Sequence, residues 1–316
     1  MAIGRNEGDR LVRCLSSVAR EKVPFVYVDS GSTDDSRNAA LRLGADVVEL
    51  DLSVPFTAAR ARNAGLWRLL EAYPDLTFVQ FVDGDCEIRD GWLATARAFL
   101  AQAADIAVVC GRRRERHPEA SVFNRLCDIE WNGPVGEILE CGGDAMMRVE
   151  PLVAVGGYRT DLIAGEEPEL CVRLRGAGWK IWRLGEEMTL HDAAMSRWTQ
   201  WWNRSKRAGH AFAEVAWIHK GSPFAIWTRS VVSAVVWGGV LPGAVLILTL
   251  FDARFAGLVL VYPLQIARMA IRAGGHPDDW RFSAFTVLGK IPEFAGIVRY
   301  HLSRLLRRRK ALIEYK

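Results

Sequence analysis

Residues 76–86 read LTFVQFVDGDC, an apolar run followed by two carboxylates on either side of a glycine. The run predicts a buried strand, but Asp and Gly are poor strand residues. In an extended chain Asp83 and Asp85 face the same side, and Gly84 allows a ligand to approach the backbone closely. A plain Asp-Gly turn would explain the same letters, so the neighbouring sequence has to decide between a turn and a site.

The strand at residues 76–83 is one of several apolar segments in the first half of the chain. We expect further strands at residues 24–29, 45–51 and 105–111, and helices over residues 57–73 and around Leu11–Val18 and Trp92–Leu100. This alternation favours an α/β fold with a mainly parallel sheet covered on both faces. In such sheets ligands bind at the carboxyl ends of the strands. Glu7, Asp29 and the Asp83/Asp85 pair fall at those ends.

Two carboxylates that leave other coordination positions open suit Mg²⁺ or Mn²⁺ carrying a phosphate. Dinucleotide enzymes also place an acid after the second strand, where Asp29 stands. The first turn here reads GRNEGD, however, and lacks the G-x-G-x-x-G phosphate cradle. The sequence therefore favours a metal-phosphate site over a dinucleotide site.

The composition is that of one or two globular domains: 316 residues, half of them hydrophobic, with a net charge of +4. Six scattered cysteines without C-x-x-C spacing predict reduced thiols in a cytosolic body, with no disulfide framework and no zinc site. The start of the chain has no basic region followed by an apolar stretch, so we expect no signal peptide.

The second half changes character at residues 230–250, SVVSAVVWGGVLPGAVLILTL, which carry no charge. This is about the length needed to cross a bilayer. A polar break, FDAR, precedes a second apolar stretch over residues 255–267, which extends to Ile271 if Arg268 snorkels. We predict a transmembrane helical hairpin over residues 230–273. The alternative is a pair of buried helices in a soluble protein, because the second stretch is short.

Amphipathic segments flank the hairpin. Residues 193–229 interleave tryptophans with arginines, and residues 276–316 repeat apolar side chains every three or four positions and end in the basic run at 304–310. Trp and basic residues beside apolar helices suit the headgroup layer and anionic lipid. Nucleic acid would also attract these charges, but the aromatics beside the apolar helices favour membrane lipids. The basic residues at the hairpin's outer ends predict a cytoplasmic body and tail.

Six motifs occur in a recognisable order: AIGRNEG (2–8), VYVDSGSTDDS (26–36), ARARNAG (59–65), FVDGDC (81–86), GGDAMMRVEPLVAVGGY (142–158) and GEEPELCVRLRGAGWKIWRL (165–184). Over residues 1–192 the set resembles family 2 glycosyltransferases of the GT-A fold, a Rossmann-like nucleotide-diphospho-sugar transferase fold. The hairpin looks like that of bacterial members that build surface polysaccharides or glycolipids at the inner membrane.

The resemblance implies roles for particular residues. It implies that Glu7, Asp29, Arg62, Asp83 and Asp144 bind the nucleotide sugar, with Arg62 contacting the nucleotide or bracing the acidic cluster. Asp85 and Asp83 form the family's D-x-D pair and would hold Mn²⁺ or Mg²⁺, with His191 as a third metal ligand. A surface or capping role for His191 is equally compatible with the sequence.

Glu166 and Glu167 occupy the family's catalytic acid pair, with Glu167 at the usual position of the base. Glu replaces the usual Asp here, so which of the two acts stays open. Alone, both acids could simply favour the start of a helix, whose dipole would keep a base ionised. The signature of processive synthases is incomplete, because Ala194 stands where Gln is expected before Arg197 and Trp198. This favours addition of a single sugar.

The function implied is an inverting transfer of sugar from a UDP- or GDP-linked donor to a lipid-linked or glycan acceptor at the cytoplasmic membrane face. The carboxylate base would take the acceptor's proton and the metal would neutralise the leaving diphosphate. A nucleotidyltransferase on a similar fold, which releases pyrophosphate, is one alternative. A catalytically degenerate membrane scaffold is another.

Overall fold

The computed structural model describes residues 1–306 and divides the chain into two compact units, the first Met1–Ala194 and the second from Met195 onward. The first unit contains, in chain order, β1 (Ala2–Gly4), α1 (Asp9–Arg20), β2 (Val26–Asp29), α2 (Ser36–Arg42), β3 (Asp46–Glu49), α3 (Ala58–Ala72), β4 (Phe78–Asp83), β5 (Cys86–Ile88), α4 (Trp92–Gln102), β6 (Ile106–Glu115), α5 (Val122–Glu130), β7 (Gly136–Ile138), β8 (Ala145–Arg148), α6 (Val149–Ala154), α7 (Glu166–Gly176) and β9 (Lys180–His191).

Within the described residues, nine strands form one sheet in the order β3-β2-β1-β4-β8-β6-β9-β5, with β7 paired to β9. The first four strands are parallel to one another. Beyond them β8 runs antiparallel between β4 and β6, and β5 and β7 run antiparallel to β9. The prediction of a mainly parallel sheet is therefore correct for the first four strands and for the parallel pair β6–β9, but wrong for β5, β7 and β8. Strand β5 directly follows β4, and β8 directly follows β7, without an intervening helix.

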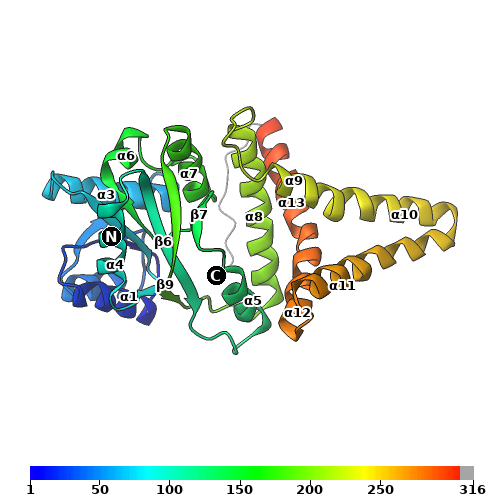
Figure 1. Ribbon diagram of the computed structural model, residues 1–316, viewed down its shortest axis with the longest axis horizontal. Coiled ribbons are helices and arrows are strands. Elements are labelled where there is room, and N and C mark those ends of the chain that lie inside the picture. The colour runs from blue at the N-terminus through cyan, green and yellow to red at the C-terminus, as the bar shows by residue number, and fades with distance from the viewer. Residues whose placement is uncertain (307–316) are drawn as a thin grey trace. The chain divides into compact units, whose positions relative to one another are not determined.

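The parallel half brings the predicted acids together. Strand β1 lies between β2 and β4, in a register that pairs Gly4 with Asp29 and Ile3 with Asp83. Right-handed connections place α1 and α2 on one face of the sheet and α3 on the other, and Figure 1 shows helices packed on both faces. The carboxyl ends of β1, β2 and β4 consequently open onto one shared edge.

Helix α3 matches its predicted range closely. The Thr57 hydroxyl accepts a hydrogen bond from the backbone N–H of Arg60 at 3.2 Å and caps the helix, which satisfies one of its unpaired N–H groups. Its buried face packs Ala59, Ala61 and Leu66 into the core. That packing carries Arg62, on the same helix, below the surface. All six cysteines are free and buried, in agreement with the reduced thiols predicted.

The second unit is helical over its described part. It comprises α8 (Trp198–Ile218), α9 (Thr228–Val235), a π-helical turn η1 (Val236–Val240), α10 (Leu241–Phe251), a 3-10 helix η2 (Ala253–Leu260), α11 (Val261–Ala273), α12 (Pro277–Leu288) and α13 (Lys290–Leu305). Helices α8 and α13 pack closely, since a Cβ on Gly209 or Gly296 would lie 2.0 Å from the facing carbonyl oxygen. Part of the predicted basic run, residues 307–310, lies outside the described residues.

Two helical stretches, Thr228–Phe251 and Ala253–Ala273, are long and apolar enough to cross a membrane. Figure 1 shows α10 and α11 extending away from α13 and converging at their tip. Only 11% and 6% of the residues in their most apolar windows are buried within the chain. Core helices of a soluble protein would bury most of these side chains, so the structure favours the predicted hairpin over a soluble helix pair.

Candidate active site

Arg62 joins the donor-side and base-side acids of the predicted site. From α3 its Nη2 lies 2.8 Å from Asp83 Oδ1, and its Nη1 lies 3.0 Å from Glu166 Oε1 and 2.7 Å from Glu167 Oε1. Only 4% of the Arg62 side chain is exposed, and its guanidinium lies over the Tyr158 ring. Burial opposes its charge, but the three carboxylates hold the pKa of Arg62 well above its ordinary value. One buried cation therefore holds three acids from distant parts of the chain together.

Glu166 and Glu167 begin α7 directly after Gly165, which adopts a left-handed conformation with φ of 81°. Both acids are buried. Burial raises the pKa of Glu167 from 4.5 to about 7, with Arg62 acting in the opposite direction and the charges of Glu166 and Asp83 adding to the rise. Burial thus outweighs the helix dipole that was expected to favour the ionised form of Glu167. A carboxyl group with a pKa near neutrality is suited to accept and release a proton.

This shift predicts a pH dependence. A Glu167 that acts as base must be ionised, so kcat/KM should fall as the pH falls through about 7. Between pH 4.5 and about 7, Glu167 is protonated in the folded protein but ionised in the unfolded chain. The free energy of unfolding should therefore decrease as the pH rises through that window. Turnover and thermal unfolding measured from pH 5 to 9 check both signs. An acid limb that persists in Glu167→Gln would contradict the assignment.

Asp83 lies at the end of β4 in a network of arginines and acids. Its backbone N–H donates to Asp144 Oδ1 at 2.9 Å, and its Oδ2 lies 3.7 Å from Nη2 of Arg113. Asp144 is 1% exposed; its Oδ2 accepts a hydrogen bond from the Thr189 hydroxyl at 2.8 Å and forms an ion pair with Arg113 Nη2 at 2.9 Å. Asp144 therefore already has protein partners at both oxygens, and its position orients Asp83 and Arg113.

Gly84 was predicted to let a ligand approach the backbone. The structure shows that Gly84 packs against β1, where its N–H donates to the Ile3 carbonyl at 2.8 Å and a Cβ would lie 2.9 Å from that oxygen. Gly143 makes a second close approach, since a Cβ there would lie 2.5 Å from Arg62 Nη2 and 2.7 Å from Asp83 Oδ2. Both glycines allow chain segments to pack tightly around the acids.

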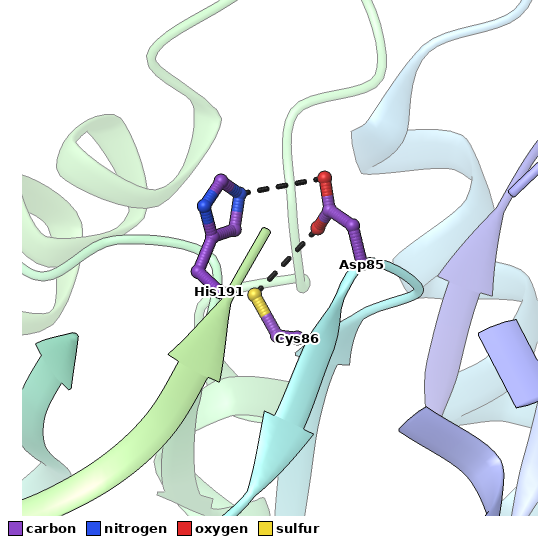
Figure 2. Close-up of side chains that lie close together, drawn as sticks. All are labelled: Asp85, Cys86 and His191. Atoms are coloured by element: carbon purple, nitrogen blue, oxygen red, sulfur yellow. Dashed lines mark hydrogen bonds and ion pairs between the residues drawn. The ribbon is translucent and has the colours of Figure 1, made fainter. Parts of the chain in front are cut away.

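Asp85 lies beside His191, as Figure 2 shows. Strand β5 pairs antiparallel with β9 in a register that sets Cys86 opposite His191, and this brings Asp85 Oδ2 to 3.4 Å from His191 Nε2. His191 is the last residue of β9 and is 8% exposed, which contradicts a surface role. Behind it, Glu115 Oε2 lies 3.6 Å from Nδ1. Histidines that bind a metal through one ring nitrogen usually have a carboxylate or carbonyl oxygen beside the other.

These residues fit a divalent ion. Adjacent ligands of an octahedral ion at about 2.1 Å are about 3 Å apart, close to the separation of Asp85 and His191. Burial lowers the pKa of His191, yet Asp85 and Glu115 outweigh it and raise that pKa above its ordinary value, so the site is electrostatically negative. Burial raises the pKa of the Cys86 thiol well above its ordinary value, and the neutral thiol contacts Asp85 at 3.6 Å. Hard ions prefer oxygen and imidazole ligands to such a thiol.

Asp29 and Glu7 lie at the neighbouring strand ends. The Asp29 carboxylate accepts hydrogen bonds from Tyr27, Gly31 and Ser32 at 2.8–3.0 Å, and this fixes the loop after β2. Glu7 pairs with Arg10 at 2.8 Å. Apart from Arg62, which reaches the site from α3, every predicted site residue thus lies at this edge of the sheet or at the start of α7.

The sequence did not predict Arg113, Glu115 or Trp131 as members of this site. Trp131 lies between His191 and Arg113: its ring centroid is 4.7 Å from that of His191 and 5.5 Å from the Arg113 guanidinium. Arg113 and Glu115 both belong to β6, which continues to Glu115 instead of ending at Gly111. The signal was the run GRRRER, whose alternate residues share one face of a strand.

The fold is the α/β GT-A fold, which is typical of nucleotide-diphospho-sugar transferases. Residues 4–147 match the model of the glycosyl transferase family 2. This match confirms the resemblance seen in the motifs of the first unit.

Two curated proteins are similar to part of the chain. The succinoglycan biosynthesis protein ExoA of Rhizobium meliloti is 28% identical over 190 residues, covering 56% of this chain and 57% of that protein. A TPR repeat-containing protein of Synechococcus elongatus is 26% identical over 172 residues, covering 51% of this chain and 40% of that protein. The chain thus spans about half the length of the curated relatives it matches.

Among solved structures, the mannosyltransferase PcManGT from Pyrobaculum calidifontis, in complex with GDP-Man and Mn²⁺, superimposes with a TM-score of 0.57 at 19% identity. The match covers 94% of this chain and 86% of that one. It confirms the predicted fold class.

Proposed function

We propose that the chain is an inverting glycosyltransferase that moves one sugar from a UDP- or GDP-linked donor to a lipid-linked or glycan acceptor at a membrane surface. The observation that carries this proposal is the bridge from Arg62 to Asp83 on one side and to Glu166 and Glu167 on the other. It holds the donor-binding edge of the sheet and a titratable carboxylate in one buried cluster.

In this proposal Glu167 takes the proton of the acceptor hydroxyl while that oxygen attacks the anomeric carbon. The C–O bond to the diphosphate breaks as the new glycosidic bond forms, so the configuration at that carbon inverts. Arg62 holds Glu167 in place, and the carboxylates of Asp29 and Asp83 contact the nucleoside. Mn²⁺ or Mg²⁺ held by Asp85 and His191 would supply Lewis-acid stabilisation of the leaving diphosphate.

The second unit would serve the acceptor. Its apolar helices and the Trp- and Arg-rich α8 suit a bilayer and its headgroups, as in a bacterial cytoplasmic membrane with the first unit in the cytoplasm. A relative named for succinoglycan biosynthesis fits an acceptor that is a growing, membrane-associated glycan. We do not assign a role in nucleic-acid binding.

The products separate this function from its alternatives. The protein in detergent, supplied with UDP- and GDP-sugars, Mn²⁺ and a membrane extract as the source of acceptor, should release nucleoside diphosphate. Release of pyrophosphate from a sugar phosphate and a nucleoside triphosphate would identify a nucleotidyltransferase instead. Nucleotide binding without turnover on any acceptor would support the scaffold.

A single charge in the hairpin tests its place in the membrane. Val240, near the centre of Thr228–Phe251, is 60% exposed, and Val240→Arg should cost insertion about 2.5–3.5 kcal/mol. More of the variant should become extractable by alkaline carbonate. The matched control is Leu302→Arg on α13, a 51% exposed position outside both apolar stretches. Equal extraction of the two variants would count against a hairpin in the bilayer.

A further inference from the structure

The donor-side acids face a second cation, Arg113, besides Arg62. Asp83 Oδ1 contacts Arg62 at 2.8 Å, while its Oδ2 lies 3.7 Å from Arg113 Nη2, which also contacts Asp144 Oδ2 at 2.9 Å. Oxygen atoms of Asp83 and Asp144 and the sulfur of Cys86 lie within 4.8 Å of one another. Arg113 therefore neutralises a cluster of acids beside the proposed metal ligands.

Arg113 is held by packing as well as by charge. Its side chain is 17% exposed, and its guanidinium lies over the Trp131 ring at 5.5 Å. Trp131 in turn contacts His191, one of the two proposed metal ligands, at 4.7 Å. The cation and the proposed ligands thus share one aromatic neighbour, and a displacement of the guanidinium would change the surroundings of the metal ligands directly.

We propose that Arg113 couples metal binding to nucleotide binding by acting as the internal counter-ion of the acidic cluster. In the nucleotide-free protein its charge opposes a divalent ion beside Asp83 and Asp85. A diphosphate, which is the strongest anion expected at this edge, attracts the guanidinium away from the acids and compensates the metal's charge. Arg113 is a positioning residue in this scheme, and the scheme rests on the nucleotide site of the proposed function.

Binding of the metal alone tests the first part of the proposal, that Arg113 opposes a divalent ion in the nucleotide-free protein. Mn²⁺ binding to the detergent-solubilised full chain can be followed by the loss of the free-ion electron paramagnetic resonance signal. Arg113→Met should bind Mn²⁺ about tenfold more tightly than the natural chain, the factor for a unit and a divalent charge about 6 Å apart even in water. Arg113→Lys restores the charge and should return the affinity toward the original value.

Two further variants control for folding and for net charge. Arg113→Gln keeps a hydrogen-bond donor for Asp144 but removes the charge, so it should also bind Mn²⁺ more tightly. It takes the place of Arg113→Met if that variant folds poorly. Arg114→Met removes the same charge from the next position of β6, where Arg114 pairs with Asp128 and Glu187, and should leave Mn²⁺ affinity unchanged.

The second half is tested by titrating UDP and GDP with and without Mn²⁺. Coupling is reciprocal, so the factor by which nucleotide tightens Mn²⁺ binding should shrink in Arg113→Met, while nucleotide affinity itself falls. Weaker or unchanged Mn²⁺ binding in both Arg113→Met and Arg113→Gln would overturn the inference. If no nucleotide binds the natural chain, the proposed function fails, but the comparison with Mn²⁺ alone still decides whether Arg113 is the counter-ion.

Discussion

Glu167→Gln is expected to lower the rate of sugar transfer by about 10²–10⁴-fold, the usual contribution of a general base. The amide keeps the size of the side chain but cannot accept the acceptor's proton. Because Glu167 lies on the base side of the Arg62 bridge, metal-dependent binding of the nucleotide should persist in this variant. The measurement is incorporation of labelled sugar into the membrane fraction, paired with a nucleotide-binding titration.

Glu166→Gln is the matched control for this prediction, since Glu166 is the neighbouring acid and contacts the same Arg62 nitrogen. We expect a smaller loss from it. The reverse order of effects would assign the base to Glu166. Full turnover in both variants would rule out this acid pair as the base.

Arg62→Met is expected to destabilise the first unit by about 3–5 kcal/mol, the range for removing one partner from a buried ion pair. The substitution would leave Asp83, Glu166 and Glu167 close together without their shared cation. Burial raises the pKa of Glu167 and Arg62 opposes that rise, so without Arg62 this pKa should rise further, and the loss of stability should be smaller at pH 5 than at pH 8. Thermal unfolding at the two pH values measures both effects.

The matched control is Arg68→Met on the same helix, α3. Arg68 also pairs with two carboxylates, Asp46 and Glu71, but at the surface, where 42% of its side chain is exposed. Ion pairs at the surface contribute little to stability, so the unfolding temperature of Arg68→Met should barely differ from that of the natural chain. Equal effects of the two substitutions would mean that the buried bridge adds no more stability than a surface pair.

The sequence predicted the parallel half of the fold well because strand, helix and turn signals there agree. Helix α3 begins where Thr57 caps it and ends where Pro74 follows, and both signals are local. The acids at the ends of β1, β2 and β4 could be predicted as neighbours, because parallel strands end at one edge. The resemblance extended the site to α7, which no local pattern connects to the sheet.

The remaining features depend on tertiary packing. The antiparallel insertion of β8 places Asp144 next to Asp83, and no periodicity in the sequence encodes that register. The predicted strand at residues 105–111 ends too early, because the last residues of β6 are charged and charged residues do not signal a buried strand. In the structure these residues face a polar site. Likewise, the helix dipole suggested an ionised Glu167, whereas burial raises its pKa. Desolvation of that kind appears only once the neighbours of a side chain are known.

The most direct test of the central claim is the binding of UDP, GDP, CMP and NAD to the full chain in detergent, with and without Mn²⁺, compared with Asp85→Asn. We predict that UDP or GDP binds only when Mn²⁺ is present. Asp85→Asn, which keeps the side chain's size but removes its charge, should abolish this Mn²⁺-dependent binding. Binding of no nucleotide, or of the same nucleotide with equal affinity in the absence of Mn²⁺ and in Asp85→Asn, would contradict a metal-assisted nucleotide-sugar site at the end of β4.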